Sequence, residues 1–309
     1  MYRSVFRPDL FAGQTAIVTG GGSGIGRCTA HELASLGATV MLVGRKPEKL
    51  AKVQAEIAEV GGRALTRAAD IREEEQVAAA VTATLAATGR IDHLVNNAGG
   101  QYAAPLAAIS AKGWDAVVRN NLTGGFLVAR ECYTQWMNDH GGAIVNIVAD
   151  MWLGMPGMGH SGAARAGMVN FTETAAAEWA ISGVRVNAVA PGWIASSGMD
   201  TYPPEIRAYF KSLKRAVPLQ RIGTESECSA AICFLLSPAA AFITGSILRV
   251  DGGAPNAKLA SPMNAFGSAF AAPGKPGAAE PAWPLPKHDR SQPWNGFHLA
   301  ETPKAFRDE

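Results

Sequence analysis

Strand-like apolar runs alternate with helix-like stretches along the chain from Thr15 to Val250. The runs that predict strands are Thr15–Val18, Thr39–Val43, Ala64–Ala68, His93–Asn96, Ala143–Val148, Val184–Ala190 and Ile247–Val250. The stretches that predict helices include Arg27–Leu36, Lys46–Glu59, Glu73–Thr88, Gly113–Asn138, Ala163–Ser182 and Glu225–Leu236. This alternation is typical of βαβ units, whose right-handed crossovers cover both faces of a parallel sheet. The pattern predicts one doubly wound α/β domain with a seven-stranded parallel sheet and a ligand site beyond the carboxyl ends of the strands.

A glycine-rich turn joins the first predicted strand to the first predicted helix. A turn of this composition is often only a turn, but a strand before it and a helix after it favour a dinucleotide site of the Rossmann type. Glycines let the backbone approach a pyrophosphate, and the helix N-terminus supplies free N–H groups and the positive end of its dipole. The residues expected to hold the cofactor here are Gly20, Ser23, Gly24, Ile25 and Gly26.

The end of the second predicted strand indicates which cofactor is bound. An NAD-preferring site would place Asp or Glu here, about 20 residues after the glycines, to bind the ribose 2′-OH. The chain has Gly44, Arg45 and Lys46 instead. Arg45 can pair with a 2′-phosphate through its planar fork, and Lys46 adds charge. An alternative is that both residues only open a solvated helix, but their position favours NADP(H).

Composition narrows the classes of function. The formal net charge of +2 gives no electrostatic case for nucleic acid, and 48% apolar residues are ample for a core. The first 14 residues contain no long apolar run, and no apolar segment reaches about 18 residues, so we expect neither a secretory signal nor a membrane span. The four cysteines and six histidines show no ligand spacing. We therefore expect reduced thiols, no metal and a cytoplasmic protein.

The composition changes after Gly253. Nine of the 18 prolines fall in the last 55 residues, where no helical or strand period is visible. A disordered tail is one interpretation. Trp283 and Trp294 favour another, an extended arm docked on the domain or on a neighbouring subunit, because aromatic side chains gain by burial. The chain thus divides into an N-terminal extension (1–13), a Rossmann domain (14–253) and a Pro-rich C-terminal arm (254–309).

Six motifs occur in the order typical of the short-chain dehydrogenase/reductase superfamily. They are Thr19 to Gly26, Asp70-Ile71, Asn96-Asn97-Ala98-Gly99, Asn121-Leu122-Thr123-Gly124, Pro191-Gly192 and Val250-Asp251-Gly252-Gly253. The chain resembles this superfamily over about residues 10 to 253. Within it, the sequence is most similar to the trans-2-enoyl-CoA and 2,4-dienoyl-CoA reductases and to bacterial citronellol/citronellal dehydrogenases. The resemblance implies a homotetramer or homodimer.

The resemblance also implies roles for further cofactor-binding residues. Asp70 is expected to accept a hydrogen bond from the adenine amino group, with Ile71 packing on the ring. Asn97, Ala98 and Gly99 are expected to line the adenosine ribose. The residues expected to hold the nicotinamide end are Pro191, Gly192, Ile194 and Ser196.

The positions that correspond to the superfamily's catalytic Asn, Ser, Tyr and Lys are atypical. Asn121 matches the Asn, whereas Ser161 stands at the Tyr position and Arg165 at the Lys position, four residues apart on one helix face. Ala149 replaces the usual Ser. The dienoyl-CoA reductases also carry Ser at the helix position, and Asp150 falls where they place an upstream Tyr. Arg165 can bind the nicotinamide ribose, but it does not relay protons near neutral pH.

Simpler roles compete for the same residues. Ser161 can cap its helix, Asp150 can pair with Arg165 or with another basic residue, and His160 can be an ordinary loop histidine beside Ser161. A further group of apolar residues indicates an apolar cleft for an acyl or terpenoid substrate, although such side chains often only pack in the core. Its predicted members are Trp193, Met199, Tyr202, Tyr209 and Phe210 on a lid, and Met151, Trp152, Leu153, Met155 and Met158 opposite.

Three functions remain open at this point. The first is NADPH-dependent reduction of an enoyl thioester with an apolar chain, in which charge collects on the carbonyl oxygen and needs only hydrogen-bond donors. The second is an NADP(H)-linked alcohol or aldehyde dehydrogenase acting on acyclic terpenoids such as citronellol. The third is a cofactor-binding structural subunit without turnover, which the combined loss of Ser, Tyr and Lys supports.

Overall fold

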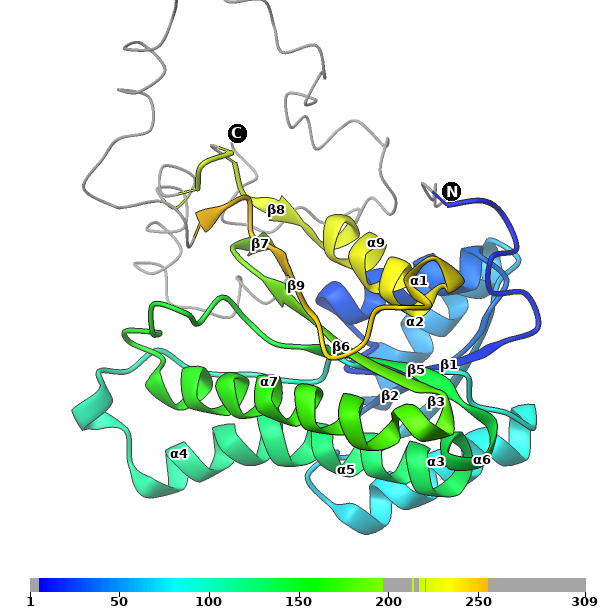
Figure 1. The fold of residues 1–309 in the computed structure, drawn as a ribbon, viewed down its shortest axis with the longest axis horizontal. Helices are drawn as coiled ribbons and strands as arrows, with labels where there is room; N and C mark the ends of the chain where they lie inside the picture. Colours follow the sequence, from blue (N-terminus) through cyan, green and yellow to red (C-terminus); the bar gives the residue numbers. More distant parts are fainter. Residues whose placement is uncertain (1–5, 197–212, 214–216, 220, 255–309) are drawn as a thin grey trace, which may run out of the picture.

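The computed structural model describes residues 6–196, 213, 217–219 and 221–254. Its centre is a seven-stranded parallel sheet in the order β3-β2-β1-β4-β5-β6-β9 (Figure 1). The strands of this sheet are β1 (Thr15–Thr19), β2 (Thr39–Gly44), β3 (Arg63–Ala68), β4 (His93–Asn96), β5 (Gly142–Ile147), β6 (Val184–Pro191) and β9 (Ile247–Val250). Each lies within one residue of its predicted range, because buried parallel strands read as short apolar runs. The doubly wound fold and the seven strands are confirmed.

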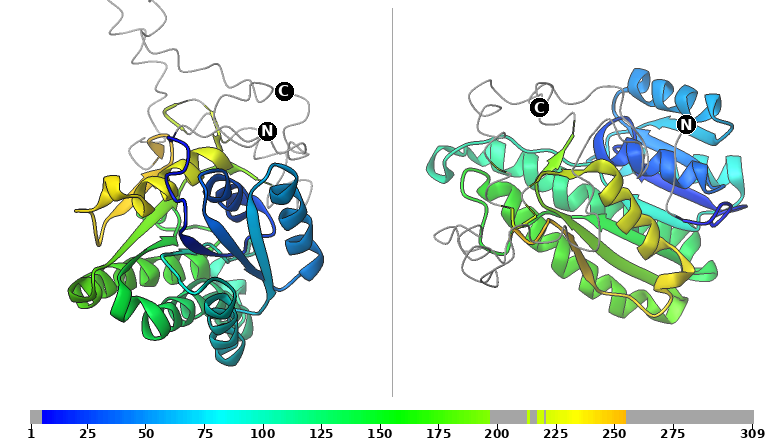
Figure 2. Two further views of the ribbon diagram at one scale, coloured as in Figure 1. Left: turned by 90° about the vertical axis from the view of Figure 1, so that its right-hand side faces the viewer. Right: turned by 90° about the horizontal axis from the view of Figure 1, so that it is seen from above.

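Helices cover both faces of the sheet (Figures 1 and 2). One face carries α1 (Gly24–Ser35), α2 (Pro47–Glu59) and α9 (Glu225–Leu236). The other carries α3 (Glu74–Thr88), α4 (Ala111–Val118), α5 (Gly124–Cys132), α6 (Asn138–His140) and α7 (Gly159–Trp179). A second, two-stranded sheet pairs β7 (Ile194–Ala195) with β8 (Gly223–Thr224).

Two helices depart from their predicted outlines. The stretch predicted as Gly113–Asn138 is interrupted by π-helical turns at Arg119–Thr123 and Tyr133–Met137, which separate α4, α5 and α6. Helix α7 begins at Gly159, four residues before the predicted start, and continues as a 3₁₀ turn to Ser182. The π-helical turn at Arg119–Thr123 and the early start of α7 contain the candidate site residues Asn121 and Ser161, and π-helical turns frequently occur at functional sites.

Apolar side chains fill the space between the sheet and each helical layer. One group, including Leu33, Leu50 and Ile232, packs under α1, α2 and α9. The other, including Val81, Val128 and Ile144, packs under α3, α5 and α7. Phe11 is fully buried in the first group, and its N–H donates to the carbonyl oxygen of Leu36 at 2.9 Å. The packing of the domain therefore begins before residue 14.

Two structural predictions concern the chain outside the core. The predicted arm lies, apart from Ala254, outside the described residues, so its docking stays a prediction. In the part of the chain that the structure describes, no helix is both long and apolar enough to cross a bilayer.

Candidate active site

The glycine-rich turn between β1 and α1 has no room for side chains at two of its glycines. Gly20 has a φ of +67°, and a Cβ there would lie 2.8 Å from Nδ2 of Asn97. A Cβ on Gly26 would lie 2.4 Å from the same nitrogen and 2.5 Å from the carbonyl oxygen of Gly20. Ser23 precedes α1 in an extended conformation, and its side chain makes no capping hydrogen bond. The turn therefore closes tightly just before α1, whose first N–H groups make no hydrogen bond to the side chain of Ser23. A glycine turn that leads into a helix N-terminus is a typical phosphate-binding geometry.

Thr19 ties the carboxyl end of β1 to the segment that follows β4. Its hydroxyl oxygen accepts from the backbone N–H groups of Asn97 and Ala98, each at 3.0 Å. Nδ2 of Asn97 in turn donates to the carbonyl oxygen of Thr19 at 3.0 Å. The segment expected to line the adenosine ribose is thereby fixed beside the turn at Gly20.

The ends of β2 and β3 bring the expected adenosine-binding residues together. The N–H of Ala69 donates to the carbonyl oxygen of Gly44 at 3.0 Å. Arg45 comes directly after Gly44, and Asp70 comes directly after Ala69. Arg45 and Lys46 are exposed, whereas Ile71 is buried. The structure therefore places these residues at one corner of the sheet.

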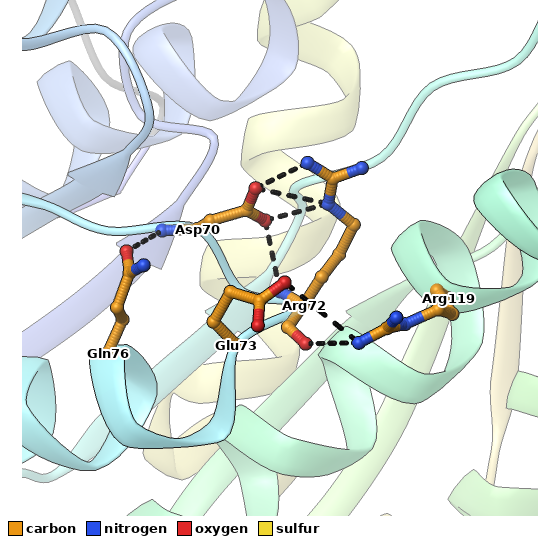
Figure 3. Close-up of polar contacts among 5 residues, drawn as sticks. All are labelled: Asp70, Arg72, Glu73, Gln76 and Arg119. Atoms are coloured by element: carbon orange, nitrogen blue, oxygen red, sulfur yellow. Dashed lines mark hydrogen bonds and ion pairs between the residues drawn. The ribbon is translucent and has the colours of Figure 1, made fainter.

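The Asp70 carboxylate, which we expected to serve the adenine amino group, is held by Arg72 (Figure 3). Nε of Arg72 lies 2.9 Å from Oδ1 and 3.1 Å from Oδ2 of Asp70, and Nη2 lies 2.5 Å from Oδ2. The Arg72 hydrogen bonds hold the pKa of Asp70 below its ordinary value, and the charge of Arg45 lowers it further. Sequence reasoning missed Arg72, although an Arg two residues after an Asp in a turn was an available signal.

Gly99 lies between two side chains that come from different elements. A Cβ at Gly99 would lie 2.6 Å from Oδ1 of Asn121 and 2.5 Å from Nη2 of Arg165. Asn121 is buried in the π-helical turn, where Nδ2 donates to the carbonyl oxygens of Gly100 at 2.7 Å and Val117 at 2.9 Å. Its Oδ1 accepts from the N–H of Gly100 at 3.0 Å. Both amide protons are committed, so Asn121 holds the loop after β4 in place rather than offering a free donor.

Arg165 is a buried cation on α7. Arg165 is only 8% exposed, and its Nη1 donates to the carbonyl oxygen of Ile147 at 2.5 Å. Burial lowers its pKa to about 10, which leaves the guanidinium charged at neutral pH. Within the described ranges no carboxylate forms an ion pair with it. The pairing of Asp150 with Arg165, one of the alternatives above, is therefore not formed.

Ser161 lies inside the first turn of α7. The residue before the helix is Met158, so the alternative that Ser161 caps the helix is wrong. Its hydroxyl is buried and lies 3.4 Å from Oε1 of Gln101. Because Arg165 follows one turn later, the two side chains share a helix face.

His160 is fully buried beside Ser161. Its Nδ1 accepts from the backbone N–H of Ser161 at 2.9 Å, which assigns the proton of the neutral ring to Nε2. In the described part of the chain Nε2 has no hydrogen-bond partner. Tyr102 packs edge-on against the ring at a centroid distance of 4.6 Å. Sequence reasoning did not single out Tyr102, because nothing in its spacing connects it with α7.

Asp150 follows β5 on the other side of the site. Its N–H donates to the carbonyl oxygen of Pro191 at 3.2 Å. Burial raises the pKa of its carboxyl, the charge of Asp251 raises it further, and Arg249 lowers it. A carboxyl whose pKa is raised is a better proton donor near neutral pH than an exposed one. Ala149 beside it has no hydroxyl to contribute.

A cleft of about 480 Å³ opens beside the ends of β6 and β9. Its lining includes Trp193, Ile194 and Leu219 together with the ion pairs Arg221–Glu227 and Arg249–Asp251. Pro191 ends β6, and Gly192 packs against Asp251, whose Cα would lie 2.7 Å from a Cβ at Gly192. The cleft therefore adjoins the segment from Pro191 to Ser196, which we expected at the nicotinamide end, rather than the group around Gly99.

Two loops beside the start of α7 carry exposed apolar side chains. Leu106 comes from one loop, and Trp152 and Leu153 come from the other. The loops are joined where the N–H of Ala104 donates to the carbonyl oxygen of Gly157 at 2.8 Å. This wall agrees with the predicted apolar cleft. The predicted lid residues Met199, Tyr202, Tyr209 and Phe210 lie outside the described residues.

Comparison with known families gives one match over most of the chain. Residues 20–255 match the family model described as enoyl-(acyl carrier protein) reductase. Peroxisomal 2,4-dienoyl-CoA reductase of Danio rerio is 39% identical over 261 residues, covering 82% of this chain and 85% of that protein. The 3-oxoacyl-[acyl-carrier-protein] reductase of Synechocystis is 40% identical over 244 residues, covering 78% of this chain and 96% of that protein.

A solved structure is more similar in sequence. The citronellol catabolism dehydrogenase AtuB of Pseudomonas aeruginosa PAO1 is 62% identical and superposes with a TM-score of 0.74. The match covers 82% of this chain and 99% of that one. These relatives include proteins named for reduction of a C=C bond and proteins named for chemistry at a carbonyl or alcohol.

Proposed function

The chain belongs to the short-chain dehydrogenase/reductase family, and we propose that within this family it reduces the activated C=C bond of enoyl thioesters with apolar chains. As a member of this family it is an oxidoreductase. The proposal adds the cofactor, the bond that is reduced and the role of each residue. NADP(H) is the proposed cofactor, and when bound it supplies the hydride.

The proposed cofactor rests on the corner formed by β1, β2 and β3. The turn at Gly20 and Gly26 can close against Asn97 because neither glycine has a Cβ, and we propose that the turn so formed binds the pyrophosphate. Arg45 is exposed and forms no ion pair within the described residues, so its guanidinium is available to a 2′-phosphate. No carboxylate stands at the end of β2 to bind a free 2′-OH.

The observation that carries the proposed reaction is the unpaired guanidinium of Arg165. Burying a charge is costly unless an opposite charge or hydrogen bonds compensate it. One carbonyl contact, from Ile147, provides only part of that compensation. Reduction of an enoyl thioester makes an enolate whose charge collects on the carbonyl oxygen. A fixed cation next to Gly99, with the Ser161 hydroxyl one turn away, stabilises such a charge as it forms.

Proton transfer separates this reaction from carbonyl reduction. An alkoxide needs a proton at once, but Ser161 is a weak acid and Arg165 does not deprotonate near neutral pH. An enolate is already stabilised, and its Cα can take a proton from water or from Asp150, whose pKa is raised by burial. The residues at the catalytic positions therefore suit the C=C reaction better.

Two variants test the proposed roles. Ser161→Ala should lower the turnover of an enoyl-CoA by roughly tenfold to a thousandfold and leave the Kd for NADPH nearly unchanged. Arg165→Ala should lower turnover and weaken NADPH, because the family resemblance places this residue at the nicotinamide ribose. Steady-state rates and fluorescence titration measure the two effects. Full turnover in Ser161→Ala would contradict the role given to its hydroxyl.

A second candidate is supported by a specific observation. The relative with 62% identity is named for citronellol catabolism, which favours an NADP(H)-linked dehydrogenase of acyclic terpenoid alcohols or aldehydes. Under this alternative Asp150, whose pKa is raised by burial, is the group that we propose to take the alcohol proton. Turnover of citronellol or citronellal with none of any enoyl thioester would establish the alternative. Tight NADPH binding with no turnover of either class would favour a cofactor-binding subunit.

A further inference from the structure

The Arg72–Asp70 pair lies after β3, beside the end of β2 that carries Arg45, the proposed ligand of the 2′-phosphate. Arg45 follows Gly44 at the end of β2, and Asp70 follows Ala69 after β3, with a 3.0 Å hydrogen bond between Ala69 and Gly44. Because Gly44 and Ala69 are hydrogen-bonded, the next residues, Arg45 and Asp70, leave the sheet side by side, and the charge of Arg45 contributes to the lowered pKa of Asp70. A 2′-phosphate held by Arg45 would therefore lie in the field of the Asp70 carboxylate, and two anions repel each other.

Arg72 cancels that carboxylate charge. Its guanidinium folds back over Asp70 and binds both carboxylate oxygens, as Figure 3 shows. The backbone N–H of Arg72 adds a third donor, 3.1 Å from Oδ1. The pair is partly exposed, with side-chain exposures of 32% for Arg72 and 18% for Asp70. Such a fork is the geometry in which a guanidinium neutralises a carboxylate most completely.

The Arg72 backbone is itself held in place by Arg119. Nη2 of Arg119 donates to the carbonyl oxygen of Arg72 at 3.1 Å and lies 3.9 Å from Oε1 of Glu73 (Figure 3). On the other side of the pair, the N–H of Asp70 donates to Oε1 of Gln76 at 2.9 Å. The turn that presents the pair is thus fixed at both ends.

We propose that Arg72 is a specificity-determining residue for the cofactor, which acts by neutralising Asp70 so that a 2′-phosphate can bind at Arg45. The inference rests on the proposed use of NADP(H). Asp70 keeps its value as an acceptor beside the adenine, while Arg72 removes the negative charge that would otherwise favour NADH. Arg72 is therefore a positioning residue that acts through Asp70, and Arg45 remains the phosphate ligand.

The test is the ratio of the Kd for NADH to the Kd for NADPH, measured by protein fluorescence on the full chain. Arg72→Ala should lower this ratio by roughly tenfold to a hundredfold, mostly through weaker NADPH binding, because an unpaired carboxylate then faces the phosphate. Asp70→Asn should raise the ratio. The double variant Arg72→Ala with Asp70→Asn should return the ratio close to the wild-type value, since no charge remains to be cancelled.

Arg90→Ala is a matched control. Arg90 forms the same fork with a carboxylate two residues away, with Nε 2.8 Å from Oδ2 and Nη2 2.6 Å from Oδ1 of Asp92. That pair precedes β4, at the opposite end of the sheet from the cofactor corner. Its loss should leave the ratio unchanged. The ratio is insensitive to a general loss of stability, which weakens both cofactors alike.

Each outcome decides one claim. An equal loss of NADH and NADPH binding in Arg72→Ala, or a double variant that does not recover, would overturn the inference and leave the proposed cofactor standing. A wild-type protein that binds NADH as tightly as NADPH would contradict the proposed cofactor itself. If Arg72→Ala does not fold, the single variant Asp70→Asn still decides, because an unchanged ratio there would show that the carboxylate has no part in selectivity.

Discussion

The two sides of the crevice treat their polar groups differently. On the cofactor side, formed by the ends of β1, β2 and β3, the partly buried polar contacts are made within the protein, as between Asp70 and Arg72 and between Asn97 and Thr19, and the remaining charge of Arg45 is exposed. The catalytic side, formed by Gly99, Asn121, Ser161 and Arg165, holds a buried guanidinium without a carboxylate partner in the described residues. A buried His160 nitrogen there also has no partner among them.

The contrast indicates that polar groups have a different role on each side. On the cofactor side the backbone alone forms the glycine turn, and the paired groups fix the shape into which a ligand fits. On the catalytic side the buried guanidinium of Arg165 has, among the described residues, only the Ile147 carbonyl to compensate its charge, which lowers the stability of the fold. Such a cost is typical of groups prearranged for a transition state. Variants on the two sides should therefore separate binding from turnover.

The largest expected effect is at Gly99. In Gly99→Ala the new Cβ would lie within 2.6 Å of Arg165 and Asn121 at once, so the guanidinium must move. Activity should fall roughly a hundredfold to a thousandfold, by the displacement of a preorganised charge. The free energy of unfolding should also fall, by about 1 to 3 kcal/mol, because the buried Arg165 and Asn121 side chains must make room for the methyl group. Steady-state kinetics and thermal unfolding measure the two quantities.

Gly100→Ala is the matched control for this prediction. A Cβ at Gly100 meets its nearest atom, Nδ2 of Asn120, at an ordinary 3.5 Å. The two variants add the same methyl group one residue apart. Equal activity in both would mean that the arrangement of Arg165 around Gly99 has no catalytic value.

The buried carboxyl of Glu32, on the face of the sheet that α1, α2 and α9 cover, should make the free energy of unfolding depend on pH. Burial between α1 and α9 raises the pKa of Glu32 from 4.5 to about 8, and its hydrogen bond with Ser229 opposes the rise. The folded state therefore binds a proton that the unfolded state has lost, so stability falls as pH rises from about 4.5 through about 8. This rise in pKa corresponds to a loss of about 5 kcal/mol in total.

Glu32→Gln should remove most of this dependence. The amide has nearly the shape of the protonated carboxyl and cannot ionise, so its free energy of unfolding should stay flatter between pH 5 and pH 8. Denaturant unfolding at several pH values measures the slope. A wild-type slope that survives the substitution would assign the pH dependence to another group, and Asp150 on the catalytic side would then be the next to test.

The smallest expected effect is at Asn97. Asn97→Ala removes the hydrogen bond to the carbonyl oxygen of Thr19, which should lower stability by about 1 kcal/mol. The Kd for NADPH should rise several-fold, because the loop beside Gly20 loses an anchor, while kcat at saturating cofactor should hold. Asn138→Ala, at the exposed start of α6, is the control for both quantities. A fall in kcat with an unchanged Kd would erase the distinction between the two sides.

The sequence predicted the cofactor side more fully than the catalytic side, for a physical reason. Buried parallel strands and a glycine turn are local patterns, so the strands and the turn at Gly20 follow from them, whereas Asn97 was expected near the cofactor from the family resemblance. The contact of Arg72 with Asp70 depends on how the turn after β3 folds back. The hydrogen bonds of the Asn121 side chain depend on a π-helical turn. The first residues of α7 were missed because a start at Gly159 is set by the packing of Leu106 and Met155 on its glycines, not by a capping residue.

The most direct test of the account follows the hydride. NADPH deuterated at the transferred position is incubated with an enoyl-CoA, a 2,4-dienoyl-CoA, citronellal and a simple ketone, and the products are examined by NMR. The account predicts deuterium at Cβ of the enoyl thioester, or at the far carbon of the conjugated dienoyl system, with a solvent proton at Cα. Deuterium on the former carbonyl carbon of citronellal or the ketone, with none in either thioester, would contradict it.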